Sequence, residues 1–227
     1  SSLIFKNSKI NVSPSLYLKD KFQRQGYKIK FIPNFIDLSK YRFKHRVKCN
    51  PKLLWVRSLH EIYNPQMAIV VMAKIVKIFP NATLSMVGPD KDGSLKFCME
   101  LTKKLGLCES ITFKGLMTKN EWISHSKSKD IFINTTNFDN MPVSVIEAMA
   151  LGFPIVSTNV GGLKYLHEDG EDALLVHKND SESMSKKILE IVHNQELSSK
   201  LSRNARRKVE NYSWNNVKKS WDEILTI

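Results

Sequence analysis

The chain has 227 residues, of which 42% are hydrophobic and 25% charged, a composition typical of one large or two small globular domains. It excludes a disordered tail, and no stretch approaches the ~20 consecutive apolar residues needed to cross a bilayer. The N-terminal sequence SSLIFKNSKINVS lacks the apolar core of a signal peptide. We therefore expect a soluble, cytoplasmic protein. Its three cysteines have no metal-like spacing, which predicts reduced thiols.

The net charge of +13 is concentrated at the N-terminal end of the chain. Residues 1–52 carry thirteen Lys and Arg against only Asp20 and Asp37, so the remaining 175 residues contribute just +2. Such a basic surface indicates peripheral contact with an anionic membrane, at its inner face, or with an acidic glycan. A solvated basic face without a partner is the alternative. We expect no nucleic acid partner, because no nucleic-acid-binding motif occurs.

Hydrophobic periodicity and helix-ending residues predict strands that alternate with helices. A strand lies within Lys52–Leu59, and apolar residues at helical spacing predict a helix over 65–79. The expected elements then follow in this order: strand 82–88, helix 94–106, strand 110–114, helix 119–127, strand 130–134, helix 142–151, strand 154–157, a short turn or helix at 163–168, and strand 173–176. Helices over 181–194, 196–211 and 213–226 close the chain, the last with Ser213 as its cap.

This alternation predicts an α/β fold with a doubly wound parallel sheet, in which ligands bind at the carboxyl ends of the strands. The residues at or just after such ends are Arg57, Gly88, Gly115 and Asp139. We expect them to converge on one crevice. No internal repeat or low-complexity linker occurs, and the one domain boundary that we expect lies between residues 33 and 51.

The segment Asn137–Val176 carries the most specific pattern of the chain. Pro142 is tolerated at the start of a helix, and the run Val143–Ala150 holds good helix formers. The free amides and positive dipole end of such a helix favour a phosphate. Asp139 lies ahead of that end and Glu147 lies within the helix, so two carboxylates bracket the expected phosphate. One could accept hydrogen bonds from a sugar and the other from a ribose.

At these residues the chain resembles the retaining GT-B glycosyltransferases of the group 1, or family 4, type. That family shares two acidic residues separated by seven positions and followed by a glycine pair. The matching positions are Asp139, Glu147–Ala150, Gly152, the run PIVST, Gly161–Gly162 and Asp169–Gly170. Upstream, Lys52–Leu59 resembles the first strand of the donor domain, ending in a phosphate-binding arginine.

The resemblance also implies a division of the chain. Residues 1–50 are similar to the end of the acceptor-side domain and the hinge. Residues 51–227 are similar to the nucleotide-sugar donor-binding domain, a Rossmann-like C-terminal half of a GT-B fold with closing C-terminal helices. Most of the acceptor half, the remaining N-terminal domain, is then expected outside this sequence.

The resemblance implies a role for each acidic or basic residue of the site. Arg57 and the helix start hold the donor diphosphate, Asp139 contacts the transferred sugar and Glu147 binds the ribose. The further donor-binding candidates are Gly88, Gly115, Asn140, Met141, Val143 and Ser144. The resemblance implies sugar transfer without a metal ion, so no metal site is expected. No cofactor is expected either, because the nucleoside diphosphate sugar is the donor substrate.

Several positions depart from the family pattern. Asp139 stands where Glu is usual, and Pro142, which has no amide to donate, replaces a glycine. Tyr63–Asn64–Pro65 stands where a lysine usually follows the arginine, which leaves Lys91 as a speculative substitute. Lys164–Tyr165 replaces a proline and a glutamate after the glycine pair.

The implied activity is transfer of a sugar, of the hexosyltransferase type, from a nucleoside diphosphate sugar to a hydroxyl of a glycan or lipid-linked acceptor, with retention. Cell-surface glycan or glycolipid synthesis is the expected setting. One alternative is a catalytically silent module on the same fold that binds a sugar nucleotide or a partner. A second is an epimerase that acts on a sugar nucleotide with a similar two-domain fold.

Overall fold

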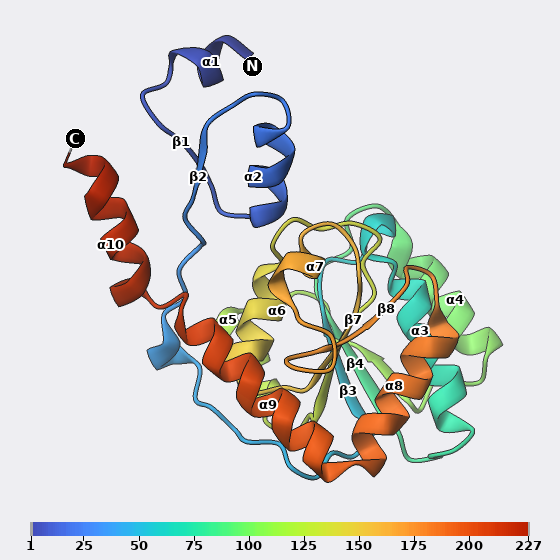
Figure 1. Ribbon diagram of the computed structural model, residues 1–227. Helices are drawn as coiled ribbons and strands as arrows, with labels where there is room; N and C mark the ends of the chain where they lie inside the picture. Colours follow the sequence, from blue (N-terminus) through green and yellow to red (C-terminus); the bar gives the residue numbers. More distant parts are fainter. Residues whose placement is uncertain (1, 227) are drawn as a thin grey trace.

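The computed structural model describes residues 2–226 and is built around a six-stranded parallel sheet (Figure 1). The strands lie in the order β5-β4-β3-β6-β7-β8. They are β3 (Lys52–Val56), β4 (Thr83–Val87), β5 (Ile111–Phe113), β6 (Ile131–Asn134), β7 (Ile155–Thr158) and β8 (Leu174–Val176). This is the strand order of a doubly wound dinucleotide-binding fold, in which the order reverses between β3 and β6. The predicted fold class is confirmed.

Helices cover both faces of this sheet (Figure 1). One face carries α3 (Pro65–Val76), α4 (Ser94–Lys104) and α8 (Ser181–His193). The other face carries α5 (Lys119–Ser126), α6 (Val143–Ala150) and α9 (Gln195–Glu210). A short helix, α7 (Leu163–Leu166), follows β7, and 3₁₀ turns occur at Leu38–Lys40 and Glu61–Tyr63. Within residues 2–226, no helix is both long enough and apolar enough to cross a membrane.

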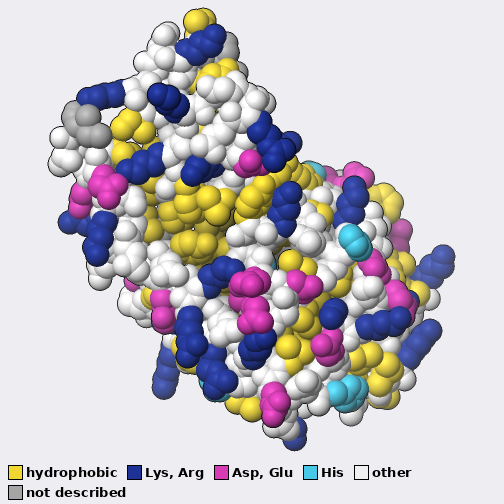
Figure 2. Space-filling view, in the orientation of Figure 1, with side chains coloured by type: hydrophobic (Ala, Val, Ile, Leu, Met, Phe, Trp, Pro, Cys, Tyr) yellow, Lys and Arg dark blue, Asp and Glu magenta, His cyan; other side chains and the backbone are white. Residues whose placement is uncertain are grey.

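The N-terminal residues form a small layer of their own, apart from the large sheet. It consists of α1 (Ser2–Asn7), β1 (Asn11–Ser13), α2 (Leu16–Gln23) and β2 (Ile29–Phe31), with β1 and β2 paired in parallel. The last helix, α10 (Trp214–Leu225), returns beside this layer, where Glu223 Oε2 lies 2.7 Å from Lys30 Nζ. Lys and Arg side chains surround the layer at the top of Figure 2, as the charge distribution of the sequence requires.

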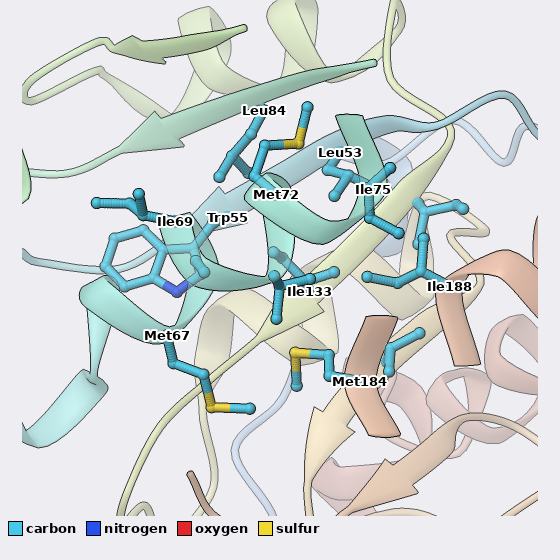
Figure 3. Packing of buried hydrophobic residues seen from close by; sticks show 14 of the residues in the cluster. Leu53, Trp55, Met67, Ile69, Met72, Ile75, Leu84, Ile133, Met184 and Ile188 are labelled. Carbon is cyan, nitrogen blue, oxygen red and sulfur yellow. The ribbon is translucent and has the colours of Figure 1, made fainter. Parts of the chain in front are cut away.

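The core below α3 and α8 holds β3 and β6 in place. Figure 3 shows apolar side chains of both helices around Trp55 of β3 and Ile133 of β6. Trp55 is 1% exposed, and its indole Nε1 donates a hydrogen bond to Thr135 Oγ1 at 2.9 Å. Burying each large apolar side chain contributes ~1.5–3 kcal/mol. The carboxyl ends of β3 and β6 are therefore rigid supports for the loops that follow them.

The segment that joins the two layers is held under α6 by a buried guanidinium. Arg46 Nε donates to Lys129 O at 3.2 Å, and Arg46 Nη1 donates to Leu151 O at 2.7 Å and Lys44 O at 3.2 Å. The guanidinium carbon lies 3.5 Å from the ring centroid of Phe153. Burial lowers the pKa of Arg46 to about 10, so the side chain remains charged at neutral pH.

Three predictions about element ends need correction. Pro142 is the N-cap of α6, with an extended ψ of 116°, rather than its first helical residue. Ser213 occupies the N-cap position of α10, but its side chain makes no capping hydrogen bond. The strand expected over 52–59 ends at Val56, so Arg57 begins a loop. The three cysteines are unpaired, as expected.

Candidate functional site

Arg57 begins the loop after β3, and its backbone packs against Gly88. The Arg57 amide donates to Val87 O at 3.0 Å, which extends the sheet ladder by one residue. A Cβ on Gly88, whose φ is 145°, would lie 1.8 Å from Arg57 O, so this close approach requires glycine. The guanidinium lies 4.3 Å from the centroid of the Tyr63 ring and forms an ion pair with Asp139. Burial lowers the pKa of Arg57, but an arginine stays charged.

The loop that carries Asp139 rests on the glycine pair Gly161–Gly162. The Gly162 amide donates to Asp139 O at 2.8 Å. A Cβ on Gly162 would lie 1.5 Å from Asn140 O, so no larger residue fits there without moving the loop. The side-chain Oδ1 of Asn140 is buried, and within residues 2–226 it has no hydrogen-bond partner. A polar atom in this state is available to a ligand.

Arg57 and Glu147 line one pocket at the carboxyl ends of β3 and β4. Glu147 lies on α6 and is 4% exposed. Its Oε1 accepts hydrogen bonds from the Tyr41 hydroxyl at 2.7 Å and from the Lys119 ammonium. The pocket therefore presents a guanidinium and a carboxylate to the same space. Its other lining residues are Val56, Ser58, Val87, Gly88, Pro89, Leu116, Met117, Lys119, Trp122, Val143 and Ser144.

The N-terminus of α6 opens into the same pocket. Hydrogen bonding within the helix begins with the amides of Val145 and Ile146, which donate to Pro142 O at 3.1 Å and 3.2 Å. Over residues 2–226, no side chain caps this helix. Val143 and Ser144 line the pocket, and among the described residues their amides have no partner. Unpaired amides at the positive end of a helix dipole form a site for an anion.

The structure brings most of the predicted residues together. Arg57, Gly88, Val143, Ser144 and Glu147 line the pocket described above. Asn140 and Met141 line a smaller neighbouring pocket with Ser15, Gly162 and Tyr165. Each of these two pockets borders the loop after β6 or the helix that follows that loop.

Three candidates lie outside these pockets. Asp139 meets the pocket only through its ion pair with Arg57. Gly115 does not line the pocket, but its carbonyl accepts a hydrogen bond at 2.8 Å from the amide of Gly88, which does. Lys91 is exposed and does not line the pocket. Within residues 2–226, no group of three or more His, Cys, Asp and Glu side chains could hold a metal ion.

The sequence analysis missed two residues of this pocket region, Tyr41 and Lys119. They contact Glu147 from positions 106 and 28 residues away in the chain, so no local spacing signals either contact. The start of α5 could be recognised from the capping box of Thr118 and Glu121. That signal predicts where the helix begins but not that its first side chain reaches Glu147.

Residues 38–208 match the family model for group 1 glycosyl transferases, and the chain belongs to this family. It is 29% identical over 178 residues to an uncharacterized glycosyltransferase of Haemophilus influenzae. It is 25% identical over 192 residues to a D-inositol 3-phosphate glycosyltransferase of Rhodococcus jostii. Both matches cover 78% of this chain but only 49% and 42% of those relatives. The chain thus spans about half the length of the curated relatives that it matches.

Solved structures share the fold. The Anabaena protein HepE, in complex with UDP and glucose, superposes with a TM-score of 0.88 at 18% identity, over 99% of this chain and 65% of that one. Sucrose-phosphate synthase of Thermosynechococcus elongatus superposes with a TM-score of 0.86 at 19% identity, over 99% of this chain and 59% of that one. At these identities the likeness establishes the architecture and not the ligand.

Proposed function

We propose that this chain is the donor-binding portion of a family 4 glycosyltransferase that transfers a sugar from a nucleoside diphosphate sugar to a hydroxyl with retention. The observation that carries this proposal is the convergence of Arg57, Glu147 and the open amides of α6 on one pocket. That pocket lies where the strand order reverses, which is where doubly wound folds bind ligands. Membership of the family supports the same reading.

The charges of the pocket suggest how the donor binds. A diphosphate fits between the Arg57 guanidinium and the amides of Val143 and Ser144, because both groups stabilise negative charge. The carboxylate of Glu147 repels a phosphate and instead accepts hydrogen bonds from hydroxyl groups. We therefore assign it to the ribose of the donor nucleotide. The UDP bound by the HepE neighbour supports a nucleotide as ligand.

The proposed reaction needs no nucleophile from the protein. The bond between the anomeric carbon and the diphosphate oxygen breaks, and the acceptor oxygen attacks from the same face. The acceptor proton passes to the departing phosphate oxygen. Arg57 and the amides at the start of α6 stabilise the charge that grows on the leaving diphosphate, and no metal ion is required for this.

The ion pair of Arg57 with Asp139 favours a second candidate, a module that binds a sugar nucleotide without transferring the sugar. In the proposed transferase Asp139 contacts the transferred sugar and Arg57 the diphosphate. Arg57 must then exchange Asp139 for the diphosphate when the donor binds, which requires the ligand to favour the rearranged state. A silent module could keep the ion pair throughout.

The proposal extends to the rest of the molecule. We infer that residues 1–50 are the end of the acceptor-side domain and the hinge, that 51–227 are the donor-binding domain, and that the remaining N-terminal domain completes the enzyme. The basic N-terminal layer then faces a glycan or lipid-linked acceptor and contacts anionic lipid at the cytoplasmic side of a membrane (Figure 2). Cell-surface glycan or glycolipid synthesis is the proposed setting.

Calorimetric titration tests the binding step. UDP, GDP and ADP are titrated into the wild-type chain and into Glu147→Ala, and we expect one of them to bind and the variant to bind it more weakly. Transfer is then measured with the acceptor-side domain restored, and the anomeric configuration of the product reports retention. Binding without transfer would favour the silent module, and no binding of any nucleotide would refute both candidates.

A further inference from the structure

The buried carboxylate of Glu147 is held at one of its two oxygens. The Tyr41 hydroxyl and the Lys119 ammonium both donate to Oε1. Within the described residues no hydrogen bond reaches Oε2. A carboxylate oxygen accepts about two hydrogen bonds, so Oε2 is the atom left for a ligand.

Tyr41 is a rigid partner for this carboxylate. It is 5% exposed and packs in the same apolar cluster as Ile146 of α6. Its backbone carbonyl accepts a hydrogen bond from Arg206 Nη1 at 3.0 Å, and the same nitrogen donates to Ala150 O at 2.7 Å. Arg206 thus ties Tyr41 to the helix that carries Glu147. Burial raises the pKa of Tyr41 above its usual value, so the phenol stays protonated and can only donate to the carboxylate.

Lys119 is a different kind of partner. Its side chain is 47% exposed, against 6% for Glu147, and lies at the start of α5 beside the pocket. A long, solvated side chain loses conformational freedom when it is fixed, and solvent weakens its ion pair. Lys119 therefore supplies positive charge near Glu147 but does not determine the direction of the carboxylate.

We propose that Tyr41 is a positioning residue for ribose recognition, whose hydroxyl holds Glu147 so that Oε2 faces the pocket shared with Arg57. Tyr41 lies in the segment that joins the N-terminal layer to the large sheet. It lines a second pocket, which shares Lys119, Val143 and Glu147 with the pocket of Arg57, so this segment contacts the nucleotide site through Glu147. The inference rests on the proposed function, because it names the protein group that orients the ribose-binding carboxylate.

The test compares nucleotides that differ only in the ribose hydroxyls. Uridine, guanosine and adenosine diphosphates and their 2′,3′-dideoxy counterparts are titrated into wild type and Tyr41→Phe. For the nucleotide that binds, we expect Tyr41→Phe to lower the affinity of the ribose form about tenfold. The affinity of the dideoxy form should stay within about twofold of wild type, because it offers no hydroxyl to Glu147.

The ratio of the affinity for the ribose form to the affinity for the dideoxy form separates a positioning role of Tyr41 from a general structural role. Tyr41→Met, which also lacks the hydroxyl, should give the same ratio of ribose to dideoxy affinity. Tyr27→Phe, which alters a tyrosine that packs on Phe5 in the N-terminal layer, should change neither affinity. An equal loss for both forms would mean that Tyr41 is only structural and would overturn the inference. Unchanged affinity for the ribose form would also overturn it while leaving the proposed function intact. If wild type binds no nucleotide, the proposed function fails and the inference with it.

Discussion

The guanidinium of Arg57 and the carboxylate of Asp139 form an ion pair across the point where the strand order reverses. Arg57 follows β3 and Asp139 follows β6, the two neighbouring strands at the centre of the sheet. The guanidinium of Arg57 places a positive charge in the wall of the pocket, and the carboxylate of Asp139 neutralises that charge. A diphosphate must therefore compete with Asp139 for the same guanidinium.

Replacing Arg57 by Ala should weaken binding of a nucleoside diphosphate by roughly 10- to 100-fold, because a hydrogen bond to a charged group contributes about 1.5–3 kcal/mol. Binding of the matching nucleoside should change little. Calorimetry with UDP and uridine, or the pair whose base binds, measures both. Arg24→Ala, which removes the exposed arginine at the C-cap of α2, is the control and should bind both ligands normally. Equal losses for diphosphate and nucleoside would refute the role given to Arg57.

Gly162→Ala should move the loop that carries Asp139 and Asn140, because the new Cβ would lie 1.5 Å from Asn140 O. Such overpacking costs ~1–3 kcal/mol, and in a chain of this size each kcal/mol lowers the thermal midpoint by ~2–4 °C. Nucleotide affinity should fall about tenfold or more as the loop leaves the site. Gly26→Ala, at a glycine with φ of 85° and open space around it, should cost stability without affecting affinity. Normal nucleotide binding by Gly162→Ala would show that the loop position does not matter.

Arg46→Met should lower the free energy of unfolding by roughly 2 kcal/mol or more, because Lys129 O and Lys44 O lose their donor and each unsatisfied buried acceptor costs about 1–3 kcal/mol. Leu151 O keeps a second donor, the Lys44 amide at 3.2 Å. Urea denaturation monitored by circular dichroism measures the change. Arg42, an exposed arginine four positions before Arg46, provides the control. The free energy of unfolding of Arg42→Met should stay within about 0.5 kcal/mol of wild type. Similar stabilities of the two variants would contradict the anchoring role of Arg46.

The buried carboxylate of Asp172 should make stability depend on pH. Burial alone raises its pKa, but the hydrogen bonds and charges of His167 and Lys208 outweigh burial and hold the pKa below its ordinary value. A carboxylate whose pKa is lower in the folded chain stabilises the fold above the unfolded value of about 3.9, and this contribution disappears as the pH falls through the folded value.

Urea denaturation at pH 6 and at progressively lower pH, below about 4, measures this effect. The stability advantage of wild type over Asp172→Asn should shrink on acidification. Lys200→Met, which removes a half-exposed partner of Glu171, should show no comparable trend. An advantage that grew as the pH fell would mean that Asp172 is not stabilised as a carboxylate.

The order of the elements could be predicted because local signals mark most of them. Asn64 accepts a hydrogen bond from the Met67 amide and Pro65 opens α3, and both residue types favour helix starts. The far end of α3 was harder to predict. Ile78 continues the apolar pattern but lies beyond Val76 and is 54% exposed, and Phe79 packs on the core from a turn. Apolar spacing alone therefore does not predict where the helical backbone stops.

The site was predicted in part for a similar reason. Arg57 and Gly88 could be placed together because residues at the carboxyl ends of neighbouring strands share one edge of the sheet. Glu147 lies within α6, so its place in the site was predicted from the family resemblance. Whether two such side chains pair depends on loop lengths and rotamers, so the bond between Arg57 and Asp139 was not predicted. The contact of Tyr41 with Glu147 could not be predicted either, because it depends on the path that the joining segment takes beneath α6.

A crystal structure of the chain with the nucleoside diphosphate that binds best tests the central claim most directly. We predict the diphosphate against the amides of Val143 and Ser144, with Arg57 turned from Asp139 to the phosphates and a ribose hydroxyl on Glu147 Oε2. A nucleotide bound elsewhere, or bound here with its ribose away from Glu147, would contradict the account.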